Sequence, residues 1–120
     1  MKFTTEELIF ATNAKVLKNN AQGRQFSIST DTRTINYENV YIGLKGETFD
    51  GEKFIPNAVE SGAKAYFTTQ GTVLDGADLV LQIENPIITY LQLAKLCLNK
   101  ISPKVIAKKG RNALPVLIDE

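Results

Sequence analysis

Hydroxyl, carboxylate and guanidinium groups gather in five consecutive residues, Ser29-Thr30-Asp31-Thr32-Arg33. Hydroxyls and backbone N–H groups can donate to phosphate oxygens, and Arg33 can add charge-assisted hydrogen bonds to the same atoms. Asp31 can hold either Arg33 or the loop backbone in place. The cluster therefore favours a site for a phosphorylated ligand. The same residues are also typical of an Asx turn that carries an exposed arginine.

A second segment whose residues could bind a ligand is Leu44-Lys45-Gly46-Glu47-Thr48-Phe49-Asp50-Gly51. Gly46 would let a ligand approach the backbone closely, Lys45 would supply a point charge, and Phe49 could pack on a base or a sugar. The alternative is a surface loop whose glycines adopt positive φ angles and whose Phe49 lies in the core.

Both segments follow predicted strands. Phe26, Ile28 and Thr30 alternate with polar residues, which predicts a half-exposed strand that runs into Asp31. Residues 40–44 form an apolar run typical of a buried strand. Because open α/β sheets bind ligands at the carboxyl ends of their strands, the two segments are placed where a site is expected.

The rest of the chain alternates helical and strand patterns. Thr4 and Glu7 form a capping-box pattern that predicts an opening helix. Asn85-Pro86 predicts the start of a helix that continues to about residue 100. Further predicted elements are strands at 15–17, 65–68 and 79–83, an amphipathic helix at 54–62, and a core stripe on the last helix made of Ile87, Tyr90, Leu91, Ala94, Cys97 and Leu98. The alternation predicts an α/β fold, a mixed sheet flanked by helices.

Composition sets limits on function. With 120 residues the chain has the size of one domain, and its 43% hydrophobic and 22% charged residues are those of a packed globular fold. The net charge of +1 provides no global field for nucleic acid or an anionic membrane. Any anion site must therefore be local.

Histidine is absent and Cys97 is the only cysteine. These counts exclude a disulfide framework, a classical zinc site and a Ser-His-Asp couple within the chain, and they predict Cys97 to be a small buried hydrophobe. We find neither a secretory signal nor an apolar stretch of membrane-spanning length, so we expect a cytoplasmic protein without membrane insertion.

The two segments together resemble the N-terminal domain of the Mur ligases, which are ATP-dependent enzymes of peptidoglycan synthesis. The resemblance extends from Thr4 to about residue 107 and includes the Gly62-Ala63 turn after the second helix. The Glu-x-Phe-Asp-Gly form most resembles the branch that joins D-alanyl-D-alanine to UDP-N-acetylmuramoyl-tripeptide. The sister branch, which adds the third peptide residue, is the alternative.

The resemblance implies that this domain holds the UDP part of a UDP-N-acetylmuramoyl-peptide, while an ATP-binding domain and a C-terminal domain complete the enzyme. The residues that would line the UDP site are Thr30, Asp31, Thr32, Arg33, Lys45, Gly46, Glu47, Thr48 and Phe49, with Asp50 and Gly51 shaping the loop. No catalytic residue and no metal ligand is implied in this chain. Many relatives carry histidine where Glu52 stands here, so no role is carried over to that position.

A second departure concerns the end of the chain. The resemblance implies a Gly-x-x-Gly-Lys-Thr loop for ATP after residue 107, but the sequence continues Lys108-Lys109-Gly110-Arg111. A lone glycine cannot form the nest of backbone donors that such a loop requires. We therefore expect a domain over residues 1–107, a tail over 108–120 outside the family pattern, and ATP and Mg²⁺ only in a full-length parent enzyme.

A different class of function is also open. Ile88 and Leu96 lie on the mostly polar side of the last predicted helix. They would mark a docking surface if the chain were a non-catalytic interaction module, although single exposed apolar residues are common.

Overall fold

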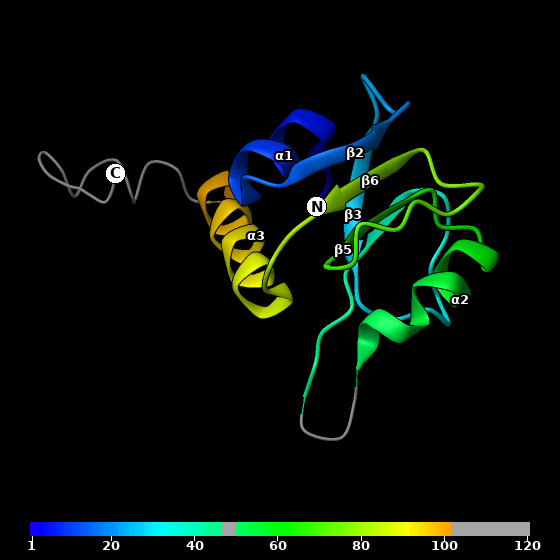
Figure 1. Cartoon of the computed structure of the whole chain (residues 1–120). Helices are drawn as coiled ribbons and strands as arrows, with labels where there is room; N and C mark the ends of the chain where they lie inside the picture. The colour runs from blue at the N-terminus through cyan, green and yellow to red at the C-terminus, as the bar shows by residue number, and fades with distance from the viewer. Residues whose placement is uncertain (47–49, 102–120) are drawn as a thin grey trace, which may run out of the picture. The chain divides into compact units, whose positions relative to one another are not determined.

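The computed structural model describes residues 1–46 and 50–101. The chain divides into two compact units, Met1–Tyr90 and Leu91–Glu120. The first unit contains a six-stranded sheet with the strand order β1-β3-β4-β5-β6-β2 (Figure 1). The strands are β1 (Phe3–Thr4), β2 (Lys15–Asn19), β3 (Gln25–Ser29), β4 (Asn39–Tyr41), β5 (Ala65–Thr68) and β6 (Leu79–Gln82).

The sheet is mixed, as the sequence predicts. Strands β3, β4, β5 and β6 pair in parallel, while β1 joins β3 and β2 joins β6 in antiparallel pairs. The parallel centre explains why β5 and the first three residues of β6 are buried, since both faces of a parallel sheet are usually covered. The predicted α/β class is confirmed.

Helix α1 (Thr5–Thr12) begins at the predicted capping box. The Glu7 N–H donates to Thr4 Oγ1 at 3.0 Å, and the Thr4 N–H donates to Glu7 Oε1 at 2.8 Å. Both bonds satisfy donors that a helix start leaves unpaired. The left-handed Asn13 (φ 54°) ends the helix.

The second helical segment is shorter than predicted and has two parts. A 3-10 helix, η1 (Gly51–Phe54), leads into α2 (Ile55–Glu60), with Pro56 in the first turn where its missing N–H costs nothing. The predicted apolar face is correct for Ile55 and Ala58, which are buried, but wrong for Phe54, which is 40% exposed. Phe54 lies in η1, so it does not follow the face of the α-helix.

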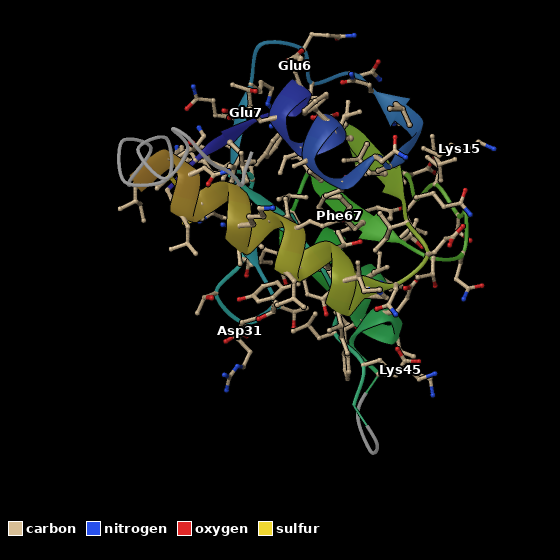
Figure 2. All side chains as sticks on the ribbon, turned by 90° about the vertical axis from the view of Figure 1, so that its left-hand side faces the viewer. Glu6, Glu7, Lys15, Asp31, Lys45 and Phe67 are labelled. Carbon is tan, nitrogen blue, oxygen red and sulfur yellow. The ribbon has the colours of Figure 1, made fainter. Side chains whose placement is uncertain are left out.

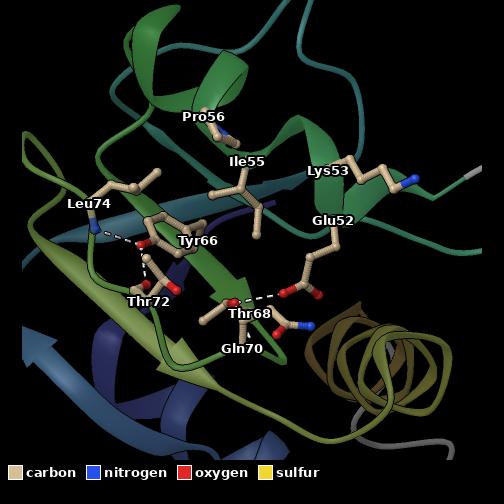
Figure 3. A pocket seen from close by; sticks show the side chains of 9 residues that line it. All are labelled: Glu52, Lys53, Ile55, Pro56, Tyr66, Thr68, Gln70, Thr72 and Leu74. Carbon is tan, nitrogen blue, oxygen red and sulfur yellow. Dashed lines mark hydrogen bonds between the residues drawn. The ribbon is translucent and has the colours of Figure 1, made fainter.

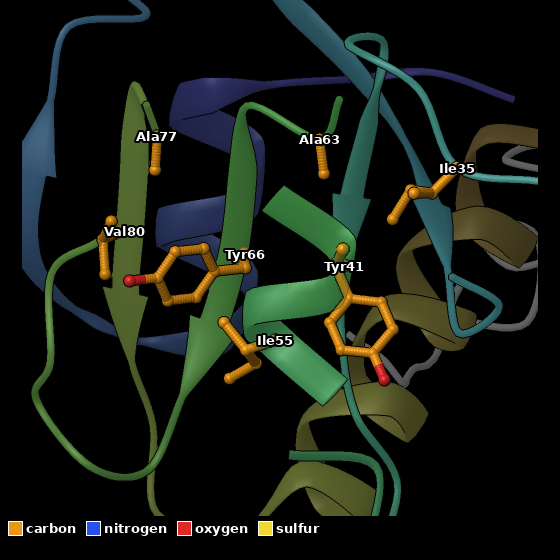
Figure 4. Close-up of a cluster of buried hydrophobic side chains, with 8 residues drawn as sticks. Ile35, Tyr41, Ile55, Ala63, Tyr66, Ala77 and Val80 are labelled. Atoms are coloured by element: carbon orange, nitrogen blue, oxygen red, sulfur yellow. The ribbon is translucent and has the colours of Figure 1, made fainter. Parts of the chain in front are cut away.

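One face of the sheet packs on α2 through a buried cluster (Figure 4). Tyr41 of β4 and Tyr66 of β5 are its largest side chains, and Ile55 of α2 belongs to the same cluster. The remaining members are Ile35, Ala58, Ala63, Ala77 and Val80. Fully burying large apolar side chains contributes about 1.5–3 kcal/mol each, so this cluster anchors the strand ends that carry the polar segments.

Helix α3 (Pro86–Ile101) begins where the sequence predicts, because Asn85 Oδ1 accepts the N–H groups of Ile87 and Ile88 at 3.0 and 3.2 Å. The predicted core stripe on this helix is wrong. Five of its six members are exposed: Ile87 (50%), Tyr90 (40%), Leu91 (61%), Leu98 (62%) and Ala94. Thr89 and Leu93 are buried instead. Apolar residues occur around most of the helix, so the helical wheel alone did not identify the buried side.

The predictions for Cys97 and for the length of the strand at 40–44 are also only partly correct. Cys97 is only partly buried. The strand predicted at 40–44 ends at Tyr41, although residues 42 and 43 remain buried. The tail predicted at 108–120 lies outside the described residues.

Candidate ligand site

The two polar segments follow neighbouring parallel strands. β3 ends at Ser29 and β4 ends at Tyr41, and these two residues are partners in the strand register. The Ile42 N–H donates to the Ser29 carbonyl at 3.0 Å, which extends the pairing to the point where both segments begin. Asp31 and Lys45 therefore lie toward the same side of the Met1–Tyr90 unit (Figure 2).

Residues 30–33 form a turn that closes on itself. Asp31 Oδ1 accepts the backbone N–H of Arg33 at 2.8 Å and its Nε–H at 3.1 Å, while Asp31 Oδ2 accepts from Nη2 at 3.0 Å. The guanidinium beside it holds the pKa of Asp31 below its ordinary value, and the carboxylate raises the pKa of Arg33. The Arg33 side chain nevertheless stays 87% exposed, so it keeps surface for a ligand.

This turn borders a hollow of about 390 Å³. All four predicted residues, Thr30, Asp31, Thr32 and Arg33, line it, together with the aromatic side chains of Tyr41 and Phe54. A lining that combines hydroxyls, a guanidinium and aromatic carbon suits a ligand that is part anion and part flat ring.

The second segment is held by contacts between distant residues. Gly51 donates its N–H to the Leu44 carbonyl at 2.7 Å, and Gly51 O accepts the Tyr41 hydroxyl at 2.7 Å. Gly43 and Gly51 meet backbone to backbone, because a Cβ on Gly43 would lie 2.3 Å from the Gly51 carbonyl carbon. Next to this contact, Lys45 and Asp50 form an isolated antiparallel β-bridge.

A second hollow, of about 480 Å³, lies beside this segment. Its lining comes from the segments after three parallel strands, from η1 with its cap, and from the start of α3: Gly43, Lys45, Asp50, Glu52, Lys53, Thr69, Gln70, Glu84 and Pro86. Lys45 and Asp50 thus border one hollow and residues 30–33 the other. Gly46 is exposed and lines neither. Glu47, Thr48 and Phe49 lie outside the described residues.

The pKa of the Tyr41 phenol responds to burial and to carboxylates that lie near both hollows. Burial raises this pKa, and the negative charges of Asp31, Asp50 and Glu52 raise it further. Tyr41 lines the hollow beside residues 30–33 and donates its hydroxyl to the Gly51 carbonyl, so it adjoins both segments.

Sequence reasoning missed several of these residues. Tyr41 and Phe54 line the first hollow, and Thr69, Gln70 and Glu84 line the second. The last three directly follow β5 and β6, so applying the rule for carboxyl ends to every predicted strand would have found them. Nothing in the spacing of Tyr41 or Phe54 indicated their positions.

Two further properties concern the described residues only. Among residues 1–46 and 50–101, no three His, Cys, Asp or Glu side chains come together as a metal site. No helix within the same ranges is long and apolar enough to cross a membrane.

The fold is an α/β domain whose mixed sheet carries two polar segments at the carboxyl ends of neighbouring parallel strands. The profile of the Mur ligase family, catalytic domain, matches residues 26–102. The chain belongs to the Mur ligase family.

Similar proteins indicate which branch of the family the chain resembles. The chain is 31% identical over 86 residues to the UDP-N-acetylmuramoyl-tripeptide–D-alanyl-D-alanine ligase of Bacillus subtilis, covering 71% of this chain and 19% of that protein. The same ligase of Haemophilus influenzae is 31% identical over 112 residues, covering 92% and 24%. A 2,6-diaminopimelate ligase of Lawsonia intracellularis is 28% identical over 102 residues, covering 82% of this chain and 21% of that protein. The predicted resemblance to the D-alanyl-D-alanine branch is confirmed.

Solved structures support the fold. MurF from Acinetobacter baumannii superposes with a TM-score of 0.67 at 23% identity, covering 78% of this chain and 20% of that chain. The chain therefore spans about a fifth of the length of these relatives.

Proposed function

We propose that this chain is the domain that anchors the uridine diphosphate part of UDP-N-acetylmuramoyl-tripeptide in a ligase that adds D-alanyl-D-alanine. The observation that carries the proposal is the pair of polar segments that follow β3 and β4, whose last residues, Ser29 and Tyr41, are partners in the strand register. The hydroxyls of Thr30 and Thr32 and the guanidinium of Arg33 suit the diphosphate, and the aromatic lining suits the base.

The second segment contributes through Lys45 and Gly46, together with Glu47, Thr48 and Phe49. Lys45 is exposed at the rim of the larger hollow and supplies a cation beside the Asp50 turn. Asp50 and Gly51 shape this turn through the contacts with Leu44 and Tyr41.

The role of the domain is substrate anchoring. Binding a remote part of a substrate contributes to catalysis by orienting the reacting group elsewhere in the enzyme. ATP and Mg²⁺ would activate the substrate carboxylate in the parent enzyme, but the Lys108-Lys109-Gly110-Arg111 sequence does not fit an ATP loop. No catalytic step is therefore assigned to this chain, and a cytoplasmic location remains an expectation.

Titration of the chain with UDP, followed by NMR amide shifts, tests the proposal. We expect saturable shifts at Thr32, Arg33 and Gly46, and Arg33→Ala should weaken binding about tenfold by removing a charge-assisted contact. The matched control is Lys15→Ala, which removes an exposed cation from β2 and should leave the affinity unchanged. Unmoved resonances at millimolar UDP would reject the proposal.

A further inference from the structure

Glu52 stands at the position where the family resemblance assigns no role, yet its carboxylate is one of the most fully bonded side chains in the structure. Glu52 Oε2 accepts from Thr68 Oγ1 at 2.7 Å and from the Thr69 N–H at 2.8 Å. Glu52 Oε1 accepts from Thr69 Oγ1 at 2.9 Å. Figure 3 shows the carboxylate directed at the end of β5.

These bonds join two parts of the sheet edge that are distant in sequence. Glu52 belongs to η1, directly after Gly51, whereas Thr68 and Thr69 lie at and beyond the end of β5. The Glu52 N–H also donates to Asp50 Oδ1 at 3.1 Å. The Asp50 turn is therefore tied to β4 through Gly51 and to β5 through Glu52.

The same residue borders two hollows. Glu52 and Lys53 line both the 480 Å³ hollow beside Lys45 and a smaller hollow of about 220 Å³ next to Ile55 and Tyr66. A carboxylate that already accepts three hydrogen bonds is suited to holding backbone in place.

We propose that Glu52 is a positioning residue that fixes the Asp50–Gly51 turn against the Thr68–Thr69 end of β5, and so sets the geometry with which Lys45 and this turn meet the uridine diphosphate. The ligand part of this inference rests on the proposed function. The positioning part concerns the ligand-free chain and stands on the three bonds alone.

The first experiment measures amide hydrogen exchange at Gly51 and Thr69 in the full chain without ligand. Glu52→Leu keeps the approximate size but removes every acceptor, so both amides should exchange about tenfold faster or more. Glu52→Gln should restore protection to within about threefold, because its carbonyl can accept from Thr68 and Thr69 while its amide donates to Thr69 Oγ1. The Ile83 amide, which donates to the Thr68 carbonyl, should stay unchanged and report that β5 and β6 remain paired.

Two further variants keep the test decisive if Glu52→Leu does not fold. Thr69→Val leaves Glu52 intact but removes one donor, and it should also speed exchange at Gly51. Glu60→Gln alters an exposed carboxylate on α2 and should leave exchange at Gly51 and Thr69 as in the unaltered chain. Unchanged exchange in both Glu52→Leu and Thr69→Val, or equal exchange in Glu52→Leu and Glu52→Gln, would overturn the positioning role.

The second experiment adds UDP to the same variants. We expect the Kd to rise about tenfold in Glu52→Leu and to stay within about threefold in Glu52→Gln. If the unaltered chain binds UDP and Glu52→Leu binds it equally well, the positioning role is rejected and the proposed function stands. If the unaltered chain does not bind UDP, the proposed function and the ligand part of this inference are rejected, while the exchange data still decide whether Glu52 holds the turn.

Discussion

The two polar segments at the ends of β3 and β4 reach their conformations by different means. In residues 30–33, Asp31 binds the backbone and the guanidinium of Arg33, two positions later in the chain. At Gly51, the contacts come from Tyr41, Gly43 and Leu44, which are seven to ten positions earlier. The first segment is a local turn, and the second depends on the folded sheet.

Because the first segment is held by local contacts and the second by contacts with the sheet, only the first can be altered without unfolding the domain. Thr30 and Arg33 are exposed, Asp31 and Thr32 are partly buried, and none of the four belongs to the buried cluster. Backbone groups of Gly43 and Gly51 are buried beside Tyr41, so changes there act on the core. We therefore expect mutations to separate binding from stability in the first segment but to couple them in the second.

The largest effect on stability is expected from Gly43→Ala. Its Cβ would lie 2.3 Å from the Gly51 carbonyl carbon and 2.5 Å from the Glu52 nitrogen, so the backbone must move. Overpacking of this kind should cost about 3 kcal/mol in the free energy of unfolding, measured by urea denaturation. Gly46→Ala is the matched control, because nothing lies within 4 Å of its Cβ. Equal stability of the two variants would contradict the close approach.

A smaller loss of stability is expected from Tyr41→Phe. The substitution keeps the ring but removes the hydroxyl that donates to the buried Gly51 carbonyl at 2.7 Å. An unpaired buried acceptor should cost about 1 to 2 kcal/mol, again measured by urea denaturation. We expect the amide of Gly51 to exchange faster as well, whereas amides in residues 30–33 should keep their exchange rates. Faster exchange in both segments would show that they are not independent.

High pH should also lower the stability of the fold around the second segment. The pKa of the Tyr41 phenol is raised from its ordinary value of 10.0, first by burial and then by Asp31, Asp50 and Glu52. The stability linked to this group is fully present below pH 10 and is lost as the pH rises through the raised folded-state pKa. Tyr66 contributes a loss of the same sign, because burial also raises its pKa. The free energy of unfolding, measured from denaturation curves at increasing pH, should therefore fall less steeply in Tyr41→Phe than in the unaltered chain.

The smallest effect on stability is expected from Arg33→Ala in the first segment. Losing the guanidinium should return the pKa of Asp31 from its lowered value toward 3.8, measured by NMR titration of the carboxylate. Because the folded-state pKa is lowered, the linked stability is present above pH 3.8 and is lost as the pH falls below it. Arg24→Ala is the control, since Arg24 pairs with Asp78 and should not alter Asp31. A shift of Asp31 in the control would show that the turn is not self-contained.

Local sequence was sufficient for the features whose contacts span only a few residues. The Thr4 capping box, the Asn85 cap of α3 and the Asp31 to Arg33 contact were all predicted and are all present. Strand β5 was also predicted with its observed bounds, because a short apolar run between turn residues is a strong strand signal.

Tertiary structure alone decided the remainder of the site. Which side of α3 is buried, how Gly43 meets Gly51, and why Glu52 faces Thr68 and Thr69 all depend on partners that are remote in sequence or on packing that a helical wheel does not contain. The first hollow likewise combines a predicted turn with Tyr41 and Phe54 from other elements. The physical reason is that propensities and caps act within one or two turns of chain, whereas close packing and strand order are settled only when the whole sheet assembles.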